Sequence, residues 1–343
     1  MTLHAMILLV VSVQADYSTL HEQAVAEYRN GHFGESERLL LRIIVGLDPA
    51  DDKHRAATLA ELGDAYASEN DLPKAERAYA DALTIYRRLS DIRNRVRMMR
   101  MIGSIYSVER RDDEASHILH DALKLAEGLN DPLVSAEVLN NLGLVYYRQG
   151  NNGKAEKCLN QALKMTSKPG TAFDRSGLLN NLGAVYATTG KFDKAEKYFK
   201  ESLQLGEKEL GLSHPDLIVT LDGLGVLYTE MTRYRDAEDQ YRRALKILDG
   251  RGSDFDVRTA QTLHMLSVTY QRAGRKGDAA STLAEAAAIA RRNLDKTPDM
   301  VAIVEDYSAA LKMQGKAAEA EELRAQAKRA RTSAGLVINA HHP

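Results

Sequence analysis

The sequence predicts an all-α protein in which one helix pair recurs along nearly the whole chain. Three observations predict it. The composition favours helix, because the 343 residues include only 7 prolines and no tryptophan and are rich in Ala, Leu, Glu and Lys. A Gly followed three residues later by a Tyr returns at a nearly constant interval. Around each copy the apolar residues are spaced i, i+3, i+4 and i+7, which places them on one face of an α-helix.

The interval of 40 to 42 residues between these copies defines a repeat. The Gly/Tyr pairs that define the repeat are Gly63/Tyr66, Gly103/Tyr106, Gly143/Tyr146, Gly183/Tyr186 and Gly225/Tyr228, with a weaker copy at Ser267/Tyr270. An Ala follows each Gly by twelve residues. Because a Gly inside a helix costs about 1 kcal/mol against Ala, its recurrence indicates a place where two helices approach closely. Each repeat therefore predicts a helix, a short turn and a second, antiparallel helix.

These marks resemble the tetratricopeptide repeat. The copy around Gly183 carries the family's residues in the family's order, namely Leu179, Leu182-Gly183, Tyr186, Gly190, Phe192, Ala195, Phe199 and Ser202-Leu203. The period exceeds the usual 34 residues, and together with the linker at residues 210–216 it resembles the kinesin-light-chain type, which is also widespread in bacteria. The resemblance implies a right-handed superhelical solenoid of about eight antiparallel helix pairs. The expected repeats lie near residues 17–50, 56–90, 96–130, 136–168, 176–210, 218–250, 260–293 and 301–331.

The repeats predict a single continuous stack over residues 16–331, because each helix pair of a solenoid contacts only its neighbours. Segments such as residues 166–171 and 249–254 are then turns between repeats, not domain boundaries. Residues 332–343 show no helical stripe and are expected to form a loose tail.

The N-terminal residues 5–13 form one apolar run, and Val13-Gln14-Ala15 after it fits a signal-peptidase site. Residues 1–15 are therefore predicted to be a signal peptide, and the protein to be exported to the periplasm or secreted. The alternative is an apolar segment that caps the first helix pair of a cytoplasmic protein. Since a run of this length is too short to cross a bilayer as a helix, no transmembrane anchor is expected.

No motif of a catalytic, cofactor-binding or metal-binding site is present. The chain lacks a P-loop, a GxSxG and a complete HExxH, and Gly250-Arg251-Gly252 lacks the third glycine of a dinucleotide loop. His117 and His120 are spaced to share a metal ion, but the sequence offers no further ligand. The single cysteine, Cys158, excludes an internal disulfide and a CxxC motif. We therefore expect neither enzymatic activity nor a cofactor.

Binding residues are expected one position after the Leu stripe of each first helix, where side chains face a groove. The candidates are Arg97, Arg100, Asn140, Asn141, Tyr147, Arg148, Asn180, Asn181, Asp222 and His264. In tetratricopeptide grooves an Asn just before Leu-Gly often holds a ligand's peptide backbone, and the resemblance gives this role to Asn141 and Asn181. Arg100 and Arg148 can meet an acidic ligand group. Alternatively, the Asn pairs line a wet groove or bridge adjacent repeats.

One basic cluster stands out, formed by Arg93, Arg95, Arg97, Arg100, Arg110 and Arg111. It predicts either a solvated helix edge or a contact for an anion or acidic peptide. A nucleic-acid partner is not expected, because the formal net charge is −2 and the cluster lacks interleaved aromatic residues. The resemblance implies a non-enzymatic scaffold that binds a peptide or an extended segment of another protein. The alternative is a peptide-sensing regulatory module whose superhelix changes pitch on binding.

Overall fold

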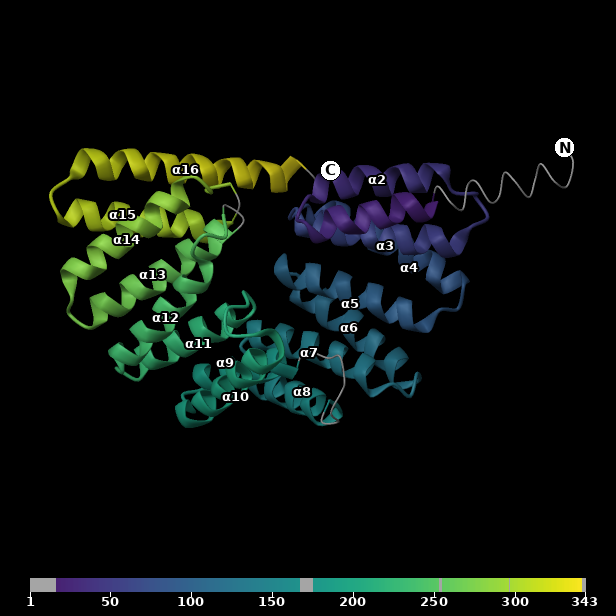
Figure 1. Ribbon diagram of the computed structural model, residues 1–343, viewed down its shortest axis with the longest axis horizontal. Coiled ribbons are helices and arrows are strands. Elements are labelled where there is room, and N and C mark those ends of the chain that lie inside the picture. The colour runs from purple at the N-terminus through teal and green to yellow at the C-terminus, as the bar shows by residue number, and fades with distance from the viewer. Residues whose placement is uncertain (1–16, 167–174, 253–254, 296, 341–343) are drawn as a thin grey trace, which may run out of the picture. The chain divides into compact units, whose positions relative to one another are not determined.

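The computed structural model describes residues 17–166, 175–252, 255–295 and 297–340, and every regular element among them is a helix (Figure 1). The chain divides at Phe173/Asp174 into two compact units, where the repeat pattern predicts one stack. The signal peptide predicted at residues 1–15 lies outside the described residues.

Eight helix pairs are found in the described part of the chain, as the sequence predicts. Unit 1 contains residues 17–29 with α2 (Phe33–Gly46), α3 (Asp52–Ser68) with α4 (Leu72–Arg88), α5 (Ile92–Val108) with α6 (Asp112–Glu127), and α7 (Pro132–Arg148) with α8 (Asn152–Met165). Unit 2 contains α9 (Arg175–Thr188) with α10 (Phe192–Leu210), α11 (Leu217–Glu230) with α12 (Tyr234–Leu248), α13 (Asp256–Arg272) with α14 (Lys276–Arg291), and α15 (Pro298–Met313) with α16 (Ala317–Ala340). The first helix of each pair is called its A helix and the second its B helix.

The C-terminal end differs from the sequence prediction. The repeats were expected to end at residue 331 and to be followed by a loose tail, but α16 is helical to Ala340. A helix continues as long as its i to i−4 backbone hydrogen bonds form, and residues 332–340 contain no proline to interrupt them. A missing apolar stripe therefore does not end a helix.

The recurring glycines make room for bulky side chains of their own B helices. A Cβ added at Gly63 would lie 2.5 Å from the ring of Tyr79, and one at Gly183 would lie 2.7 Å from the ring of Phe199. The same relation joins Gly103 to Leu119, Gly143 to Leu159 and Gly225 to Tyr241. Since all of these side chains are buried, a larger residue at the glycine would displace the core. This packing explains why glycine recurs despite its cost in a helix.

The turn inside each pair uses a residue with a positive φ, seven positions after the repeat glycine. Gly occupies this position at Gly150 and Gly190, and at Gly274 in the pair marked by Ser267; φ is 70° at Gly190. The next residue, Lys191, donates its backbone N–H to the carbonyl of Tyr186 at 2.9 Å, which ends the A helix. Arg110 and Thr232 take the same conformation, with φ of 63° and 59°. Both side chains are strained there, because the left-handed region favours glycine.

Four of the repeat tyrosines tie their A helices, α3, α5, α11 and α13, to the B helix before each. The hydroxyl donates to a Glu carboxylate in Tyr66–Glu37 at 3.0 Å, Tyr106–Glu76 at 3.0 Å, Tyr228–Glu196 at 3.1 Å and Tyr270–Glu238 at 2.8 Å. In three of them an Arg five residues after the Tyr pairs with the same Glu and lies over the Tyr ring, as Arg275 does 4.3 Å from the ring centroid of Tyr270. We call this contact the Tyr–Glu latch.

Candidate functional site

The A helices of each unit lie against one another. In unit 1, α5 contacts α7, and in unit 2 contacts run from α9 through α11 and α13 to α15. Side chains in register, 40 to 42 residues apart, meet along these contacts, as Thr229 and Thr269 do at 2.8 Å. We call the surface that the A helices turn away from their B helices the A-helix face of each unit. All ten predicted binding residues lie on A helices: two on α5, four on α7, two on α9 and one each on α11 and α13.

On the A-helix face of unit 1, the predicted arginines are already paired. Arg97 Nη2 lies 2.7 Å from Asp64 Oδ2, and Arg100 Nη2 lies 3.1 Å from Glu137 Oε2. The guanidinium of Arg148 donates to the backbone carbonyl of Ser107 on the neighbouring A helix. These arginines therefore hold adjacent A helices together. Each would have to leave its partner, or share it, to meet an acidic ligand.

The asparagines of α7 are half-buried at the same face. Asn141 Nδ2 lies 3.5 Å from the backbone carbonyl of Arg100 on α5. This contact corresponds to the bridging alternative considered from the sequence. Asn140 and Tyr147 are half-buried beside it, and each also has a partner within the protein.

Four of the six arginines in the basic cluster, Arg93, Arg97, Arg100 and Arg111, pair with carboxylates. Arg93 Nη2 lies 2.6 Å from Asp131 Oδ2, and this guanidinium holds the pKa of Asp131 below its ordinary value. Arg111 pairs with three glutamates, Glu76, Glu109 and Glu114. Its acidic partners come from other helices or turns, so the sequence run of arginines alone did not reveal them. These four ion pairs leave less of the cluster's positive charge for an anion than the sequence predicts.

The A-helix face of unit 2 exposes aliphatic side chains instead. Val219 and Val226 lie seven residues apart on α11 and are 45% and 42% exposed. On the neighbouring A helices, half-buried Ala184 and Val268 take the repeat position of Val226, and half-buried Ala187 lies three residues after Ala184 on α9. We call these five residues the valine strip. The ten candidate binding residues do not include them, because those ten were chosen mainly for hydrogen bonding. Ala184 lies four residues after Asn180 on the same face of α9, and Val226 takes the position of Ala184 in the next repeat.

Polar groups flank the valine strip. Asn180 on α9 is half-buried, and its Oδ1 is buried without a hydrogen-bond partner in the described structure. A buried amide oxygen in this state is unusual in a folded protein. The adjacent Asn181 is also half-buried and has a partner within the protein. His264 Nε2 lies 2.9 Å from Asp306 Oδ2, so this predicted residue ties α13 to α15.

Asp222 does not face a groove, contrary to the sequence prediction. Its side chain lies between α11 and α13, leaving the residue 5% exposed, and accepts hydrogen bonds from Thr262 Oγ1 at 3.2 and 3.1 Å. Burial raises the pKa of Asp222 to about 7, against the opposing effects of Arg258 and the Thr262 hydroxyl. The prediction fails because α13 packs over a position that helix periodicity alone leaves open.

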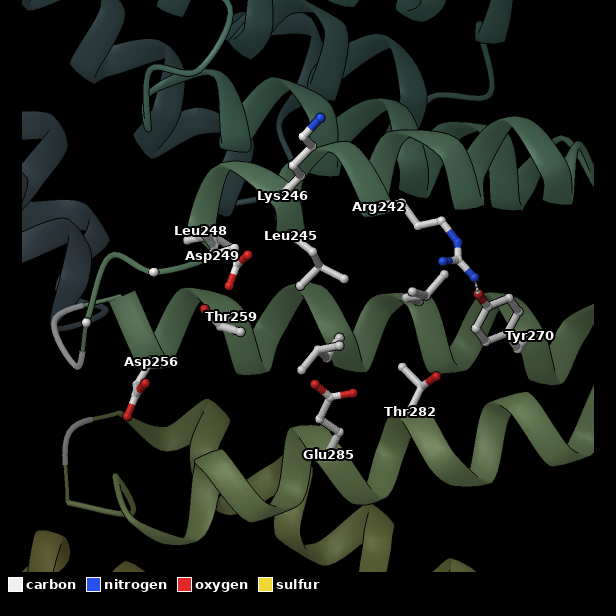
Figure 2. A pocket seen from close by; sticks show the side chains of 14 residues that line it. Arg242, Leu245, Lys246, Leu248, Asp249, Asp256, Thr259, Tyr270, Thr282 and Glu285 are labelled. Carbon is white, nitrogen blue, oxygen red and sulfur yellow. Dashed lines mark hydrogen bonds between the residues drawn. The ribbon is translucent and has the colours of Figure 1, made fainter.

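A hollow of about 820 Å³ lies away from these residues, between α12, α13 and α14 (Figure 2). Its lining includes Arg242, Leu245, Lys246, Asp249, Asp256, Thr259, Leu263, Leu266, Tyr270, Thr282 and Glu285. Arg242 is engaged there, since its Nε lies 2.9 Å from Glu238 and its Nη2 lies 3.3 Å from the Tyr270 hydroxyl. Groups of both charges are spread around an apolar floor, so the lining favours no single ligand chemistry.

The described histidines and the cysteine that the sequence offered for metal or thiol chemistry show no arrangement for either. Within the described ranges, no group of three or more His, Cys, Asp or Glu side chains is placed to hold a metal ion. His120 Nε2 lies 2.8 Å from the Tyr146 hydroxyl, while His117 is exposed. Burial raises the pKa of the Cys158 thiol, which disfavours the reactive thiolate. None of the helices in the described residues has both the length and the apolar character to cross a membrane.

Family models of the tetratricopeptide repeat match most of the repeat region. One matches residues 95–168 and 174–249, and a second matches residues 55–92 and 259–299, so that together they cover more than half of the chain. No curated protein matches the sequence.

Several solved structures share the fold. A Rap protein complexed with Competence and Sporulation Factor superposes with a TM-score of 0.61 at 15% identity, covering 80% of this chain and 74% of that one. A signal-transduction ATPase from Pyrococcus horikoshii with a tetratricopeptide repeat sensor gives 0.59 at 19% identity, covering 81% of this chain and 42% of that one. BtubC from P. vanneervenii gives 0.56 at 23% identity, covering 64% and 90%. At these identities the likeness concerns the fold.

Proposed function

Because the chain belongs to the tetratricopeptide-repeat family, we propose that it is a non-enzymatic scaffold that binds an extended segment of another protein on the A-helix face of unit 2. The family is in general a protein-interaction fold and not a catalytic one. The observation that carries the proposal is the valine strip, which leaves two large aliphatic side chains of one helix stripe in contact with solvent. Exposed apolar groups rimmed by polar residues are typical of interaction sites.

The chemistry of this face favours an uncharged, aliphatic segment over an acidic one. The charged side chains near the strip already have partners, since Arg272 Nη1 lies 2.6 Å from Glu230 Oε1 and His264 pairs with Asp306. The arginines predicted to meet an acidic ligand lie in unit 1 and are bound to carboxylates or to a backbone carbonyl there. Binding would therefore gain mostly from burying apolar surface.

Asn180 supplies a hydrogen-bonding group beside the strip. Its amide has two donors and an acceptor, which suits the alternating N–H and C=O groups of an extended backbone. The Oδ1 atom lacks a partner in the described structure, so a small rotation of the amide toward a ligand N–H would satisfy it. The role that the family resemblance gives to Asn181 is compatible with the same face.

A photo-reactive residue introduced at Val226 tests this proposal in the native host. Crosslinks to one partner are expected from position 226 and not from position 45, where Val45 on the B helix α2 is 87% exposed. With the partner in hand, Val226→Glu should weaken its binding at least tenfold in calorimetry, and Val45→Glu should leave it unchanged. Equal crosslinking from both positions, or full affinity in Val226→Glu, would place the binding surface elsewhere.

The asparagine variants separate the backbone contact from the apolar one. Asn180→Ala and Asn181→Ala should each weaken binding by about 0.5–1.5 kcal/mol if the amide holds the ligand backbone. Asn141→Ala is the matched change in unit 1 and should leave binding unchanged. Circular dichroism of all three variants should show intact helicity, because none of these side chains is among the fully buried residues of its helix.

The alternative function is a regulatory module that senses a peptide by changing the arrangement of its repeats. Two proteins of similar fold support considering this alternative. One is an ATPase with a tetratricopeptide repeat sensor, and the other is a Rap protein complexed with Competence and Sporulation Factor. Small-angle scattering with and without the partner distinguishes the two functions, since a scaffold should keep its radius of gyration and a sensor should change it.

We further propose that the protein is exported with loss of its first 15 residues. The support is the apolar run at residues 5–13 followed by Val13-Gln14-Ala15. Mass spectrometry of the native protein should find Asp16 as the first residue in a periplasmic or secreted fraction. An N-terminus at Met1 in a cytoplasmic fraction would instead favour the capping-segment alternative.

A further inference from the structure

A carboxyl group is enclosed where α11 meets α13. Asp222 makes no ion pair with any described residue, and its hydrogen-bond donor is the hydroxyl of Thr262, which is itself fully buried. A second tie between the same helices joins the buried hydroxyls of Thr229 and Thr269 at 2.8 Å. Two polar contacts therefore close this junction, and one of them contains a group that can titrate.

The described surroundings of the Asp222 carboxyl provide no paired cation to stabilise its ionised form. From α13, the half-buried Arg258 acts on it through space without forming an ion pair. From α12, Tyr241 lies near it, and burial together with Asp222 raises the pKa of this phenol, which therefore stays neutral. On the side of α10, the uncharged hydroxyls of Ser202 and Thr220 meet at 3.1 Å. On α9, which also packs against α11, the residue in the repeat position of Asp222 is the uncharged Asn180. Arg258 is thus the charged group that faces the carboxyl.

We propose that Asp222 makes the packing of α11 against α13 depend on proton uptake. The neutral carboxyl both donates to and accepts from the Thr262 hydroxyl, which satisfies it inside the junction. The ionised carboxylate has one hydroxyl donor and no paired cation, so opening the junction to water favours it. The raised pKa of Asp222 is in accord with this geometry.

The valine strip lies on the same helices, because its residues belong to α9, α11 and α13, and Val226 follows Asp222 by about one turn of α11. A shift of α11 relative to α13 would separate Val226 from Val268, so proton loss would alter the surface assigned to the partner. This consequence rests on the proposed function. The proton-linked opening itself does not, because it belongs to the free protein.

Hydrogen exchange of the free full-length protein tests the inference. After correction for the intrinsic pH dependence of exchange, the protection of α11 and α13 amides should fall by up to about tenfold per pH unit between pH 5 and 7 and level off above. Asp222→Asn should abolish this fall, since the amide mimics the neutral carboxyl. Asp249→Asn, which changes an exposed carboxylate of the same unit, should keep it.

A protection that stays constant over this range in the unaltered protein, or falls equally in Asp222→Asn, overturns the inference. Carboxyl ¹³C NMR of Asp-labelled protein gives a second test that does not require the Asn variant to fold. The Asp222 resonance, identified by its shift in Thr262→Ser, should titrate with a midpoint near 7. A midpoint near the ordinary value of 3.8 would equally overturn the inference.

Discussion

Units 1 and 2 build the same repeat with different polar contacts. In unit 1, Asp side chains cap A helices, as Asp91 does by accepting from the N–H of Asn94 at 3.0 Å, and ion pairs such as Arg100–Glu137 join neighbouring A helices. In unit 2, α11, α13 and α15 begin without a side-chain cap, and the A helices are joined in part by buried hydroxyl and carboxyl groups. The repeat register therefore fixes where helices meet, and leaves open which chemistry joins them.

This difference separates the surfaces as well. On the A helices of unit 1, charged side chains such as Arg97 and Arg100 pair with carboxylates, so this face is mainly polar, with Val108 at the end of α5 as an exposed aliphatic residue. In unit 2, buried hydroxyl and carboxyl groups form hydrogen bonds between the A helices, and Val219 and Val226 are exposed to solvent. Its A-helix face is therefore the better site for an apolar partner segment. The stability of the two units should also respond to different solution conditions. Exposed ion pairs weaken as salt rises, whereas a buried carboxyl makes stability depend on pH.

The largest expected effect comes from the bulky residues under the repeat glycines. Tyr79→Ala in unit 1 and Tyr241→Ala in unit 2 should each destabilise their unit by about 3–5 kcal/mol, because both side chains are buried and the cavity cannot close. Tyr186→Ala should cost a similar amount, since Tyr186 is 3% exposed. Denaturation followed by hydrogen exchange in each unit measures the loss. Equal loss of protection in both units from one variant would show that they unfold as one body.

Asp222 should make unit 2 less stable as the pH rises. The folded-state pKa of about 7 exceeds the ordinary value of 3.8, so the unfolded chain releases its proton first. Stability should fall by about 1.4 kcal/mol per pH unit between about pH 4 and pH 7 and then stay level. Urea titrations over this range should show the fall in unit 2, and Asp222→Asn should remove it. A fall of the same size in Asp222→Asn would trace the pH dependence to other groups.

Replacing the strained turn residues should stabilise each unit. Thr232→Gly should add about 1 kcal/mol, because Thr is β-branched and φ is 59°. Arg110→Gly in unit 1 should add less, since an unbranched side chain tolerates the left-handed region better. Asn70→Gly is the control, as Asn is already suited to its φ of 61°. The order of the three midpoints in thermal unfolding checks this explanation, and a less stable Thr232→Gly would contradict it.

The smallest effect is expected from the ion pairs of unit 1. Arg100 and Glu137 are partly exposed, so a double-mutant cycle with Arg100→Met and Glu137→Gln should give a coupling of about 0.2–1 kcal/mol. This coupling should shrink in high salt, whereas the Thr229–Thr269 contact of unit 2 should be insensitive to it. A coupling that survives high salt would mean that the pair is more enclosed than its exposure indicates.

The fold was predictable from the sequence because it depends on sterics that recur. Gly183 and Phe199 occupy fixed positions in the repeat. The close contact between their two helices therefore appears in the sequence as a recurring spacing between a glycine and a bulky residue. The candidate site was predictable only as a register. Periodicity placed Asn180, Asp222 and His264 on one side of their helices, but burial of Asp222 depends on how closely the next A helix packs. That distance comes from many side chains together, so no single position reveals it.

The Tyr–Glu latch has an order along the chain. In each case the accepting carboxylate precedes the donating hydroxyl, as Glu37 precedes Tyr66 and Glu238 precedes Tyr270. A chain leaving the ribosome thus carries each of these acceptors out before its donor is made, so α3, α5, α11 and α13 each meet a B helix that has already been synthesised. Synthesis can then add these repeats in order from the N-terminus, with no latch hydroxyl waiting for a carboxylate still to be translated.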